Sequence, residues 1–255
     1  MQNIIEIKNV NKIFSKNYKS ARVQLKKIFF ENIFGCKEIT TLKKDEFYAL
    51  KNFDLTIKKN ERIAILGPNG SGKSTLLKML SGIYLPDKGE ILVNGEISSI
   101  LELSTGFKTE LTGLENIYLK FAMMGKQKEE VDTIINEVIH FSELEEFMDT
   151  PIKHYSSGMK SKLGFAIVTT LKPEILILDE VFAAGDKRFR KKSESRIKEL
   201  YTDTTTILVS HNMKIIKDIA QRVIVLEHGK KVFDGNTLEG IAYYEKIMSI
   251  NLSKS

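Results

Sequence analysis

The hydrophobic residues of the chain follow two different patterns along its length. In residues 4–10 and 49–57, apolar positions alternate with charged ones, which predicts two strands of an early antiparallel layer. Four later segments are almost continuously apolar, which is typical of strands covered on both faces of a parallel sheet. These segments are residues 62–66, 175–178, 206–209 and 223–226.

Stretches with helical periodicity separate these expected strands. Strand, turn and helix follow one another in residues 62–81, 175–200 and 206–220, which predicts an α/β fold with right-handed crossovers. Residues 112–170 have apolar positions at helical spacing and interrupt this order. We therefore expect a helical subdomain inserted between two halves of an α/β core.

The chain is expected to form one domain, because no stretch rich in Ser, Gly or Pro divides its 255 residues. The expected parts are a core with an antiparallel β layer at about 1–111 and 171–235, a helical subdomain at about 112–170, a basic insertion at about 15–47 and a C-terminal helix at about 236–255. Within the insertion, residues 20–34 have the pattern of a basic amphipathic helix.

The charge of the chain is concentrated in one segment. Its net charge of +6 comes from residues 12–51, which hold ten basic and four acidic residues, while the remainder is neutral. This distribution argues against a general nucleic-acid-binding protein. The segment either lies against anionic lipid headgroups or an acidic polymer, or forms a solvated basic face.

Composition excludes several other classes of protein. With 42% hydrophobic and 28% charged residues, the chain has the composition of a folded globular protein. No run approaches the roughly 18 to 20 apolar residues that span a bilayer. Cys36 is the single cysteine, so an internal disulfide and a zinc site built from several thiolates are both excluded. These features predict a cytosolic chain.

The strongest motif lies in residues 67–74, which read Gly-Pro-Asn-Gly-Ser-Gly-Lys-Ser and match the phosphate-binding loop G-x-x-x-x-G-K-[ST]. It stands between an expected strand and an expected helix, as that loop requires. Backbone N–H groups of such a loop and of the helix start surround phosphate oxygens, Lys73 reaches the β- and γ-phosphates, and the Ser74 hydroxyl binds Mg²⁺. A chance glycine-rich turn is the alternative. The candidate nucleotide-binding residues are Gly67, Pro68, Asn69, Gly70, Ser71, Gly72, Lys73, Ser74 and Thr75.

A second motif is the apolar strand that ends in Asp179 and Glu180. Open α/β sheets bind ligands at the carboxyl ends of their strands, so Asp179 is placed to hold Mg²⁺. Glu180 is then the candidate general base for an attacking water. By themselves, acids after a strand commonly mark a helix start.

The third motif, residues 154–159, reads His-Tyr-Ser-Ser-Gly-Met, and Ser156 by itself predicts a helix N-cap. Tyr-Ser-Ser-Gly-Met resembles the signature sequence of ATP-binding cassette (ABC) ATPases, usually Leu-Ser-Gly-Gly-Gln. The order of motifs along the chain resembles that family throughout. The resemblance implies an α/β P-loop NTPase of ABC type, with a mixed sheet core, an antiparallel β layer and an inserted helical subdomain.

The resemblance also implies roles for further residues. Ser156, Ser157 and Gly158 would contact the γ-phosphate of ATP held by the opposite subunit of a head-to-tail homodimer. His211, which ends an apolar run, resembles the switch histidine that contacts the γ-phosphate, although a lone histidine is more often structural. Asp186 resembles the loop aspartate that bridges the subunits, and it also fits a helix N-cap.

The adenine-stacking aromatic residue and the glutamine of the family are assigned to no single residue. Phe14 and Tyr48 compete for the aromatic position that stacks on adenine, and either residue also fits an ordinary core position. The family's glutamine between the sheet and the helical subdomain is absent from residues 100–110, so we carry its role over to no residue.

Details of the sequence resemble one branch of the family, the ATPases that export bacterial capsule, O antigen or teichoic acid. These details are the signature variant, residues 103–107 and 111–116, and the end of the insertion at 46–50. The chain ends soon after Tyr243, so we expect no C-terminal sugar-binding domain.

The resemblance to this branch implies an ATPase that uses ATP and Mg²⁺ at the cytoplasmic face of the inner membrane. It would power export of a polysaccharide or its lipid-linked form through a separate permease dimer, which makes most of the contacts with the polymer, and no nucleic acid is expected. The alternatives are a soluble ABC ATPase that acts on ribosomes or DNA, and a regulatory subunit without turnover. The presence of both Glu180 and His211 argues against the latter.

Overall fold

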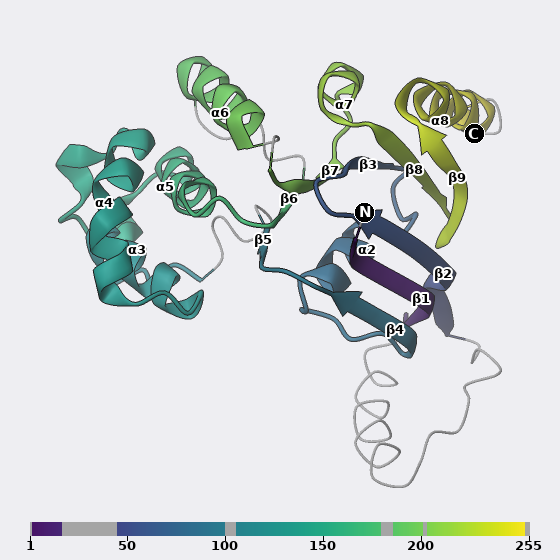
Figure 1. Ribbon diagram of the computed structural model, residues 1–255, viewed down its shortest axis with the longest axis horizontal. Helices are drawn as coiled ribbons and strands as arrows, with labels where there is room; N and C mark the ends of the chain where they lie inside the picture. The colour runs from purple at the N-terminus through teal and green to yellow at the C-terminus, as the bar shows by residue number, and fades with distance from the viewer. Residues whose placement is uncertain (1, 17–44, 100–105, 180–185, 201–202, 253–255) are drawn as a thin grey trace, which may run out of the picture.

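The computed structural model describes residues 2–16, 45–99, 106–179, 186–200 and 203–252 of the chain (Figure 1). The described strands are β1 (Asn3–Ser15), β2 (Glu46–Lys58), β3 (Arg62–Leu66), β4 (Lys88–Val93), β5 (Ile97–Ser99), β6 (Ile175–Asp179), β7 (Thr205–Val209), β8 (Arg222–Glu227) and β9 (Lys230–Asn236). The described helices are α2 (Lys73–Leu80), α3 (Gly113–Met123), α4 (Lys128–Ser142), α5 (Ser157–Thr170), α6 (Lys187–Leu200), α7 (Met213–Ile219) and α8 (Thr237–Leu252), with 3₁₀ turns η2 (Glu145–Phe147) and η3 (Ile152–His154).

The described strands form two sheets. The larger sheet has the order β5-β6-β7-β3-β8-β9, in which β9 alone is antiparallel to its neighbour. The smaller sheet has the order β2-β1-β4 and is antiparallel. These sheets confirm the predicted mixed core and antiparallel layer, and β3 occupies the predicted residues.

The larger sheet is covered on both faces, as its apolar strands require. In β3, Ile63 and Ile65 pack in one hydrophobic cluster with the antiparallel layer and α2, whereas Ala64 and Leu66 pack in a second cluster with the helices. Successive side chains of a strand point to opposite faces, so one short strand serves both clusters. This burial fixes the edge of the sheet where β3 ends and the phosphate loop begins.

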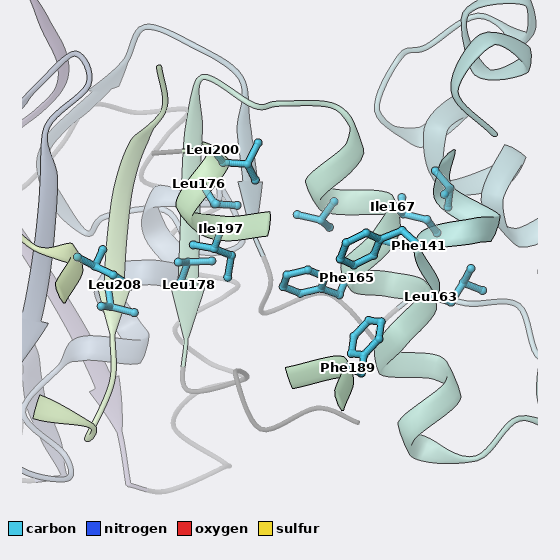
Figure 2. Close-up of a cluster of buried hydrophobic side chains, with 14 of the residues drawn as sticks. Phe141, Leu163, Phe165, Ile167, Leu176, Leu178, Phe189, Ile197, Leu200 and Leu208 are labelled. Atoms are coloured by element: carbon cyan, nitrogen blue, oxygen red, sulfur yellow. The ribbon is translucent and has the colours of Figure 1, made fainter. Parts of the chain in front are cut away.

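Helices α3, α4 and α5 lie together at one end of the molecule, away from the antiparallel sheet (Figure 1). Residues Leu163 to Thr170 of α5 are all buried, so this helix is the centre of the group. Figure 2 shows how α6 connects it to the sheet: Ile197 and Leu200 lie toward Leu176 and Leu178 of β6, while Phe189 lies beside Phe165. Helices α3, α4 and α5 fall within residues 112–170, the range predicted for the helical subdomain.

Some expectations are corrected or lie outside the described residues. Strands β4, β5 and β9 were not predicted, because β4 and β9 are largely exposed edge strands and β5 has three residues. The expected amphipathic helix at 20–34 lies outside the described residues. Among the helices that the structure describes, none combines the length and the apolar character needed to cross a membrane.

Candidate nucleotide site

The phosphate loop runs from the end of β3 to the start of α2, close against neighbouring backbone. Gly72 has φ 109°, and a Cβ atom there would lie 2.4 Å from the Ala49 carbonyl oxygen of β2. A Cβ atom on Gly67 would lie 2.3 Å from the Leu226 carbonyl oxygen of β8. Only glycine fits both positions, so the two residues hold the loop in its tight path between β2 and β8.

The loop and the start of α2 carry hydrogen-bond donors that are suited to an anion. Within the described residues no side chain caps the start of α2, and the buried Ser71 Oγ has no hydrogen-bond partner. The Lys73 Nζ folds back over the loop and donates to the carbonyl oxygens of Gly67 at 2.6 Å and Pro68 at 3.0 Å. A helix start with its N–H groups and a lysine beside it attracts a phosphate.

A cavity of about 320 Å³ opens in front of the loop at the carboxyl ends of β3 and β7. The polar side chains belong to the loop, to the start of α2 and to His211, whereas β1 and β2 contribute apolar side chains. The described lining residues are Phe14, Phe47, Ala49, Asn69, Gly70, Ser71, Gly72, Lys73, Ser74, Thr75, Val209 and His211. The cavity therefore has a phosphate-binding part and an aromatic part, which is the division that a nucleotide requires.

The aromatic part is formed by Phe14 and Phe47, which are paired across β1 and β2 with ring centroids 6.2 Å apart. Tyr48, the alternative to Phe14, is not among the described residues that line the cavity; the Lys51 Nζ lies 5.1 Å from its ring centroid. Neighbouring side chains of a strand point to opposite faces, so Phe47 and Ala49 share the cavity face. Phe47 was not predicted as a site residue, although its position two residues before Ala49 places both on one face of the strand.

The described members of the predicted catalytic and metal-binding residues, His211 and Asp179, lie at the same edge of the sheet. His211 lines the cavity just after β7. Asp179 is the last residue of β6 and pairs in register with Val209 of β7, which also lines the cavity. Glu180 lies outside the described residues, and its role stays a prediction.

The signature residues begin α5 at a separate, exposed place. The Ser156 Oγ accepts a hydrogen bond of 3.1 Å from the Met159 N–H, which is the predicted N-cap. Ser156 and Ser157 are exposed, and a Cβ atom on Gly158 would meet nothing closer than the Ser156 Oγ at 3.8 Å. None of the three is among the described residues that line the cavity.

Asp186 caps the start of α6. Its Oδ1 accepts hydrogen bonds from the N–H groups of Arg188 at 3.0 Å and Phe189 at 2.9 Å, and its Oδ2 accepts one from the Lys162 Nζ at 2.9 Å. The Lys162 hydrogen bond, together with the backbone N–H groups, lowers the pKa of Asp186 to about 2. The carboxylate is therefore ionised at neutral pH and held by α5 and the start of α6.

A phosphate loop at the carboxyl edge of a mixed sheet, with an antiparallel layer and a helical group beside it, defines a P-loop nucleotide-binding ATPase. The sequence profile of the ABC transporter family matches residues 50–183, more than half of the chain. The chain belongs to this family as an ATP-binding subunit, and its activity is ATP hydrolysis.

Curated relatives identify the branch of the family to which the chain is similar. The chain is 42% identical over 209 residues to the O-antigen export system ATP-binding protein RfbB of Klebsiella pneumoniae, covering 82% of this chain and 85% of RfbB. It is 39% identical over 229 residues to the teichoic acids export ATP-binding protein TagH of Shouchella clausii, covering 89% of this chain and 61% of TagH. The resemblance to polysaccharide-export ATPases is thus confirmed, and the matches give no support to a ribosome- or DNA-directed ATPase.

Solved structures show the same fold. A dimeric ATP-binding cassette in a post-hydrolysis state, bound to ADP and Pi, superposes with a TM-score of 0.69 at 23% sequence identity, covering 91% of this chain and 98% of that cassette. An ATP-binding subunit of another ABC transporter superposes with a TM-score of 0.70 at 21% identity, covering 91% of this chain and 90% of that subunit.

Proposed function

We propose that this chain powers the export of a surface polysaccharide, or its lipid-linked form, across the inner (cytoplasmic) membrane by hydrolysing ATP on the cytoplasmic face. The observation that carries the proposal is the 42% identity to RfbB over 85% of that protein. The chain acts as a homodimer attached to a separate permease dimer, which contacts most of the polymer.

The two parts of the cavity fit the two parts of ATP. The triphosphate lies against the loop, where Lys73 and the N–H groups at the start of α2 stabilise its negative charge. The adenine stacks against the rings of Phe14 and Phe47 at the aromatic end. An aromatic pair of this kind holds the base without requiring a polar side chain at that end.

The donor set also fits Mg²⁺. Ser74 lines the cavity beside Lys73, and Asp179 is the last residue of β6, where it pairs with Val209 of β7. Hydroxyl and carboxylate oxygens are the ligands that Mg²⁺ prefers, and it takes its other ligands from phosphate and water. When bound, the ion neutralises charge on the β- and γ-phosphates.

The hydrolytic step is assigned to the chain's own side chains. Glu180 accepts the proton of the attacking water as general base. His211 donates a hydrogen bond to the γ-phosphate and keeps it in line with the water. The exposed start of α5 brings Ser156 and Gly158 to the γ-phosphate in the opposite subunit's cavity, where the free N–H groups of the helix favour an anion.

Deletion of the gene from its source organism tests the proposal. Loss of the exported polymer from the cell surface, with its lipid-linked precursor retained inside, is the expected result. The wild-type gene should restore export, whereas Lys73→Ala should not, because that chain binds ATP weakly. Normal surface polymer in the deletion strain, or ATP turnover by the purified chain that rises with ribosomes or DNA, would contradict the proposed function.

A further inference from the structure

Lys162 lies where α4, α5 and α6 meet, outside the nucleotide cavity. Its Nζ is 2.9 Å from the Asp186 Oδ2 and 3.3 Å from the Glu143 Oε2. It also lies 4.9 Å from the ring centroid of Phe189. The Lys162 side chain is 14% exposed, so the ammonium group is enclosed by the two carboxylates and the ring.

Glu143 joins the same ion network from the end of α4. It is the C-cap of that helix, with φ 57°, a conformation that side chains other than glycine rarely adopt. Although burial favours the neutral acid, hydrogen bonds from Lys192 and Lys162 lower the pKa of Glu143. The Lys192 Nζ, 3.3 Å from Glu143, also donates to the carbonyl oxygen of Phe141 at 3.0 Å. The end of α4 is thus tied to both other helices.

An aromatic cluster lies beside these ion pairs. Phe141, Phe165 and Phe189 come one each from α4, α5 and α6, and their ring centroids are 5.7 to 6.0 Å apart. Figure 2 shows the three rings grouped between the helices. All three residues are buried, which fixes the spacing of the helices near the charged groups.

Lys162 therefore connects two parts with expected roles in the dimer. The proposed function places the start of α5 at the γ-phosphate of the opposite subunit, and the family resemblance predicts that Asp186 bridges the subunits. Lys162 belongs to α5, whose first residues follow Ser156, and it binds Asp186 at the start of α6. We propose that Lys162 is a positioning residue: it fixes Asp186 relative to the signature end of α5, so that both meet the opposite subunit as one preorganised unit. This inference rests on the proposed ATP-driven dimer.

The opposite role, in which Lys162 competes with the second subunit for Asp186, fits the contacts less well. Asp186 keeps its Oδ1 on the α6 backbone and its side chain is 59% exposed, so its bond to Lys162 leaves surface for a partner. Lys162 is held by Glu143 from the other side. The two roles give opposite results when the lysine charge is removed, which makes them separable by experiment.

The test uses the full chain with Lys162→Met, which keeps the stem on the Phe189 ring and removes the charge. ATP affinity is measured by calorimetry at a concentration where the chain is monomeric, and ATP-driven dimerisation by sedimentation in the Glu180→Gln background. ATP affinity should be unchanged because Lys162 does not line the described cavity. Dimerisation in the Glu180→Gln background, and kcat in the Lys162→Met chain that keeps Glu180, should each fall about tenfold, the loss expected for one charged hydrogen bond.

Two variants control this measurement. Lys162→Arg keeps the charge and should retain most of the wild-type kcat. If Lys162 acted through packing alone, keeping the charge would not determine kcat. Lys191→Met removes an exposed lysine from the neighbouring helix α6 and should change nothing. If Lys162→Met folds poorly, Glu143→Gln removes one carboxylate of the network with little change of shape and should weaken dimerisation in the same direction.

The outcomes separate the inference from the function on which it rests. Dimerisation that is unchanged or stronger in Lys162→Met, while the Glu180→Gln parent dimerises with ATP, would overturn the role of Lys162 alone. Absence of ATP-driven dimers in the parent chain would overturn the proposed dimeric motor, and this inference with it.

Discussion

Phe47 and Tyr48 are neighbours on β2, but only Phe47 lines the described nucleotide cavity. Stacking of a base on an aromatic ring contributes about 1–3 kcal/mol, so Phe47→Ala should weaken ATP binding roughly tenfold. Tyr48→Ala removes a similar ring one position away and is the matched control, with little expected effect. Calorimetry with ATP measures both. A larger loss in Tyr48→Ala would make Tyr48 the adenine contact.

Asp186 gives a second residue-level prediction, a dependence of stability on pH. Its pKa is lowered to about 2 in the folded chain, against about 3.9 when unfolded. A lowered carboxyl pKa stabilises the fold fully above the unfolded value, and this contribution disappears as pH falls from about 4 toward 2. Asp186→Asn keeps a residue suited to cap α6 but loses the charge.

Urea unfolding of both chains at a series of pH values measures this effect. The stability difference between wild type and Asp186→Asn should be largest near neutral pH and should shrink below about pH 4. A difference that stays constant down to pH 2 would show that the Lys162 contact does not depend on the Asp186 charge.

At the scale of elements, the start of α5 combines a structural and a proposed catalytic role. The Ser156 Oγ caps the helix, and Ser156→Ala should lower the free energy of unfolding by about 1 kcal/mol. Ser156→Gly should cost only a few tenths of a kcal/mol, because glycine is tolerated as an N-cap. Both variants lack the hydroxyl proposed to contact the nucleotide of the opposite subunit, so both should lose ATP turnover about tenfold. Full ATP turnover in Ser156→Gly would show that Ser156 acts only as the N-cap of α5.

The elements also show how far the sequence predicts the structure. Strand β3 and the phosphate loop were predictable because a fully buried strand and a loop with required glycines both leave strong local patterns. Strands β4 and β9 were not, because they are largely exposed and lack a clear apolar pattern. The pairing of β4 also depends on β1, which is distant in the sequence, whereas β9 forms a hairpin with the adjoining β8. The contact between Lys162 and Asp186 joins α5 to α6 across 24 positions and leaves no local pattern at all.

At the scale of the whole molecule, the cavity and the signature residues are in different places on one subunit. The described cavity is lined from β1, β2, the phosphate loop and the end of β7, whereas Ser156 is at the exposed start of α5. Two subunits related by a twofold axis in head-to-tail orientation would form two sites, each from the loop of one chain and the helix start of the other. A mixture of two inactive variants distinguishes this arrangement from a site within one subunit.

Lys73→Ala removes the phosphate-binding charge, and Ser156→Asp keeps an effective N-cap while placing a negative charge toward the γ-phosphate. Each variant alone should be inactive, because both sites of its dimer carry the defect. In a mixed dimer, one site carries both defects and the other has an intact loop and an intact helix start. Random pairing should therefore restore about a quarter of the sites, measured as ATP turnover after mixing the purified chains. Turnover that stays at the level of the separate variants, while sedimentation confirms mixed dimers, would contradict a site shared between subunits.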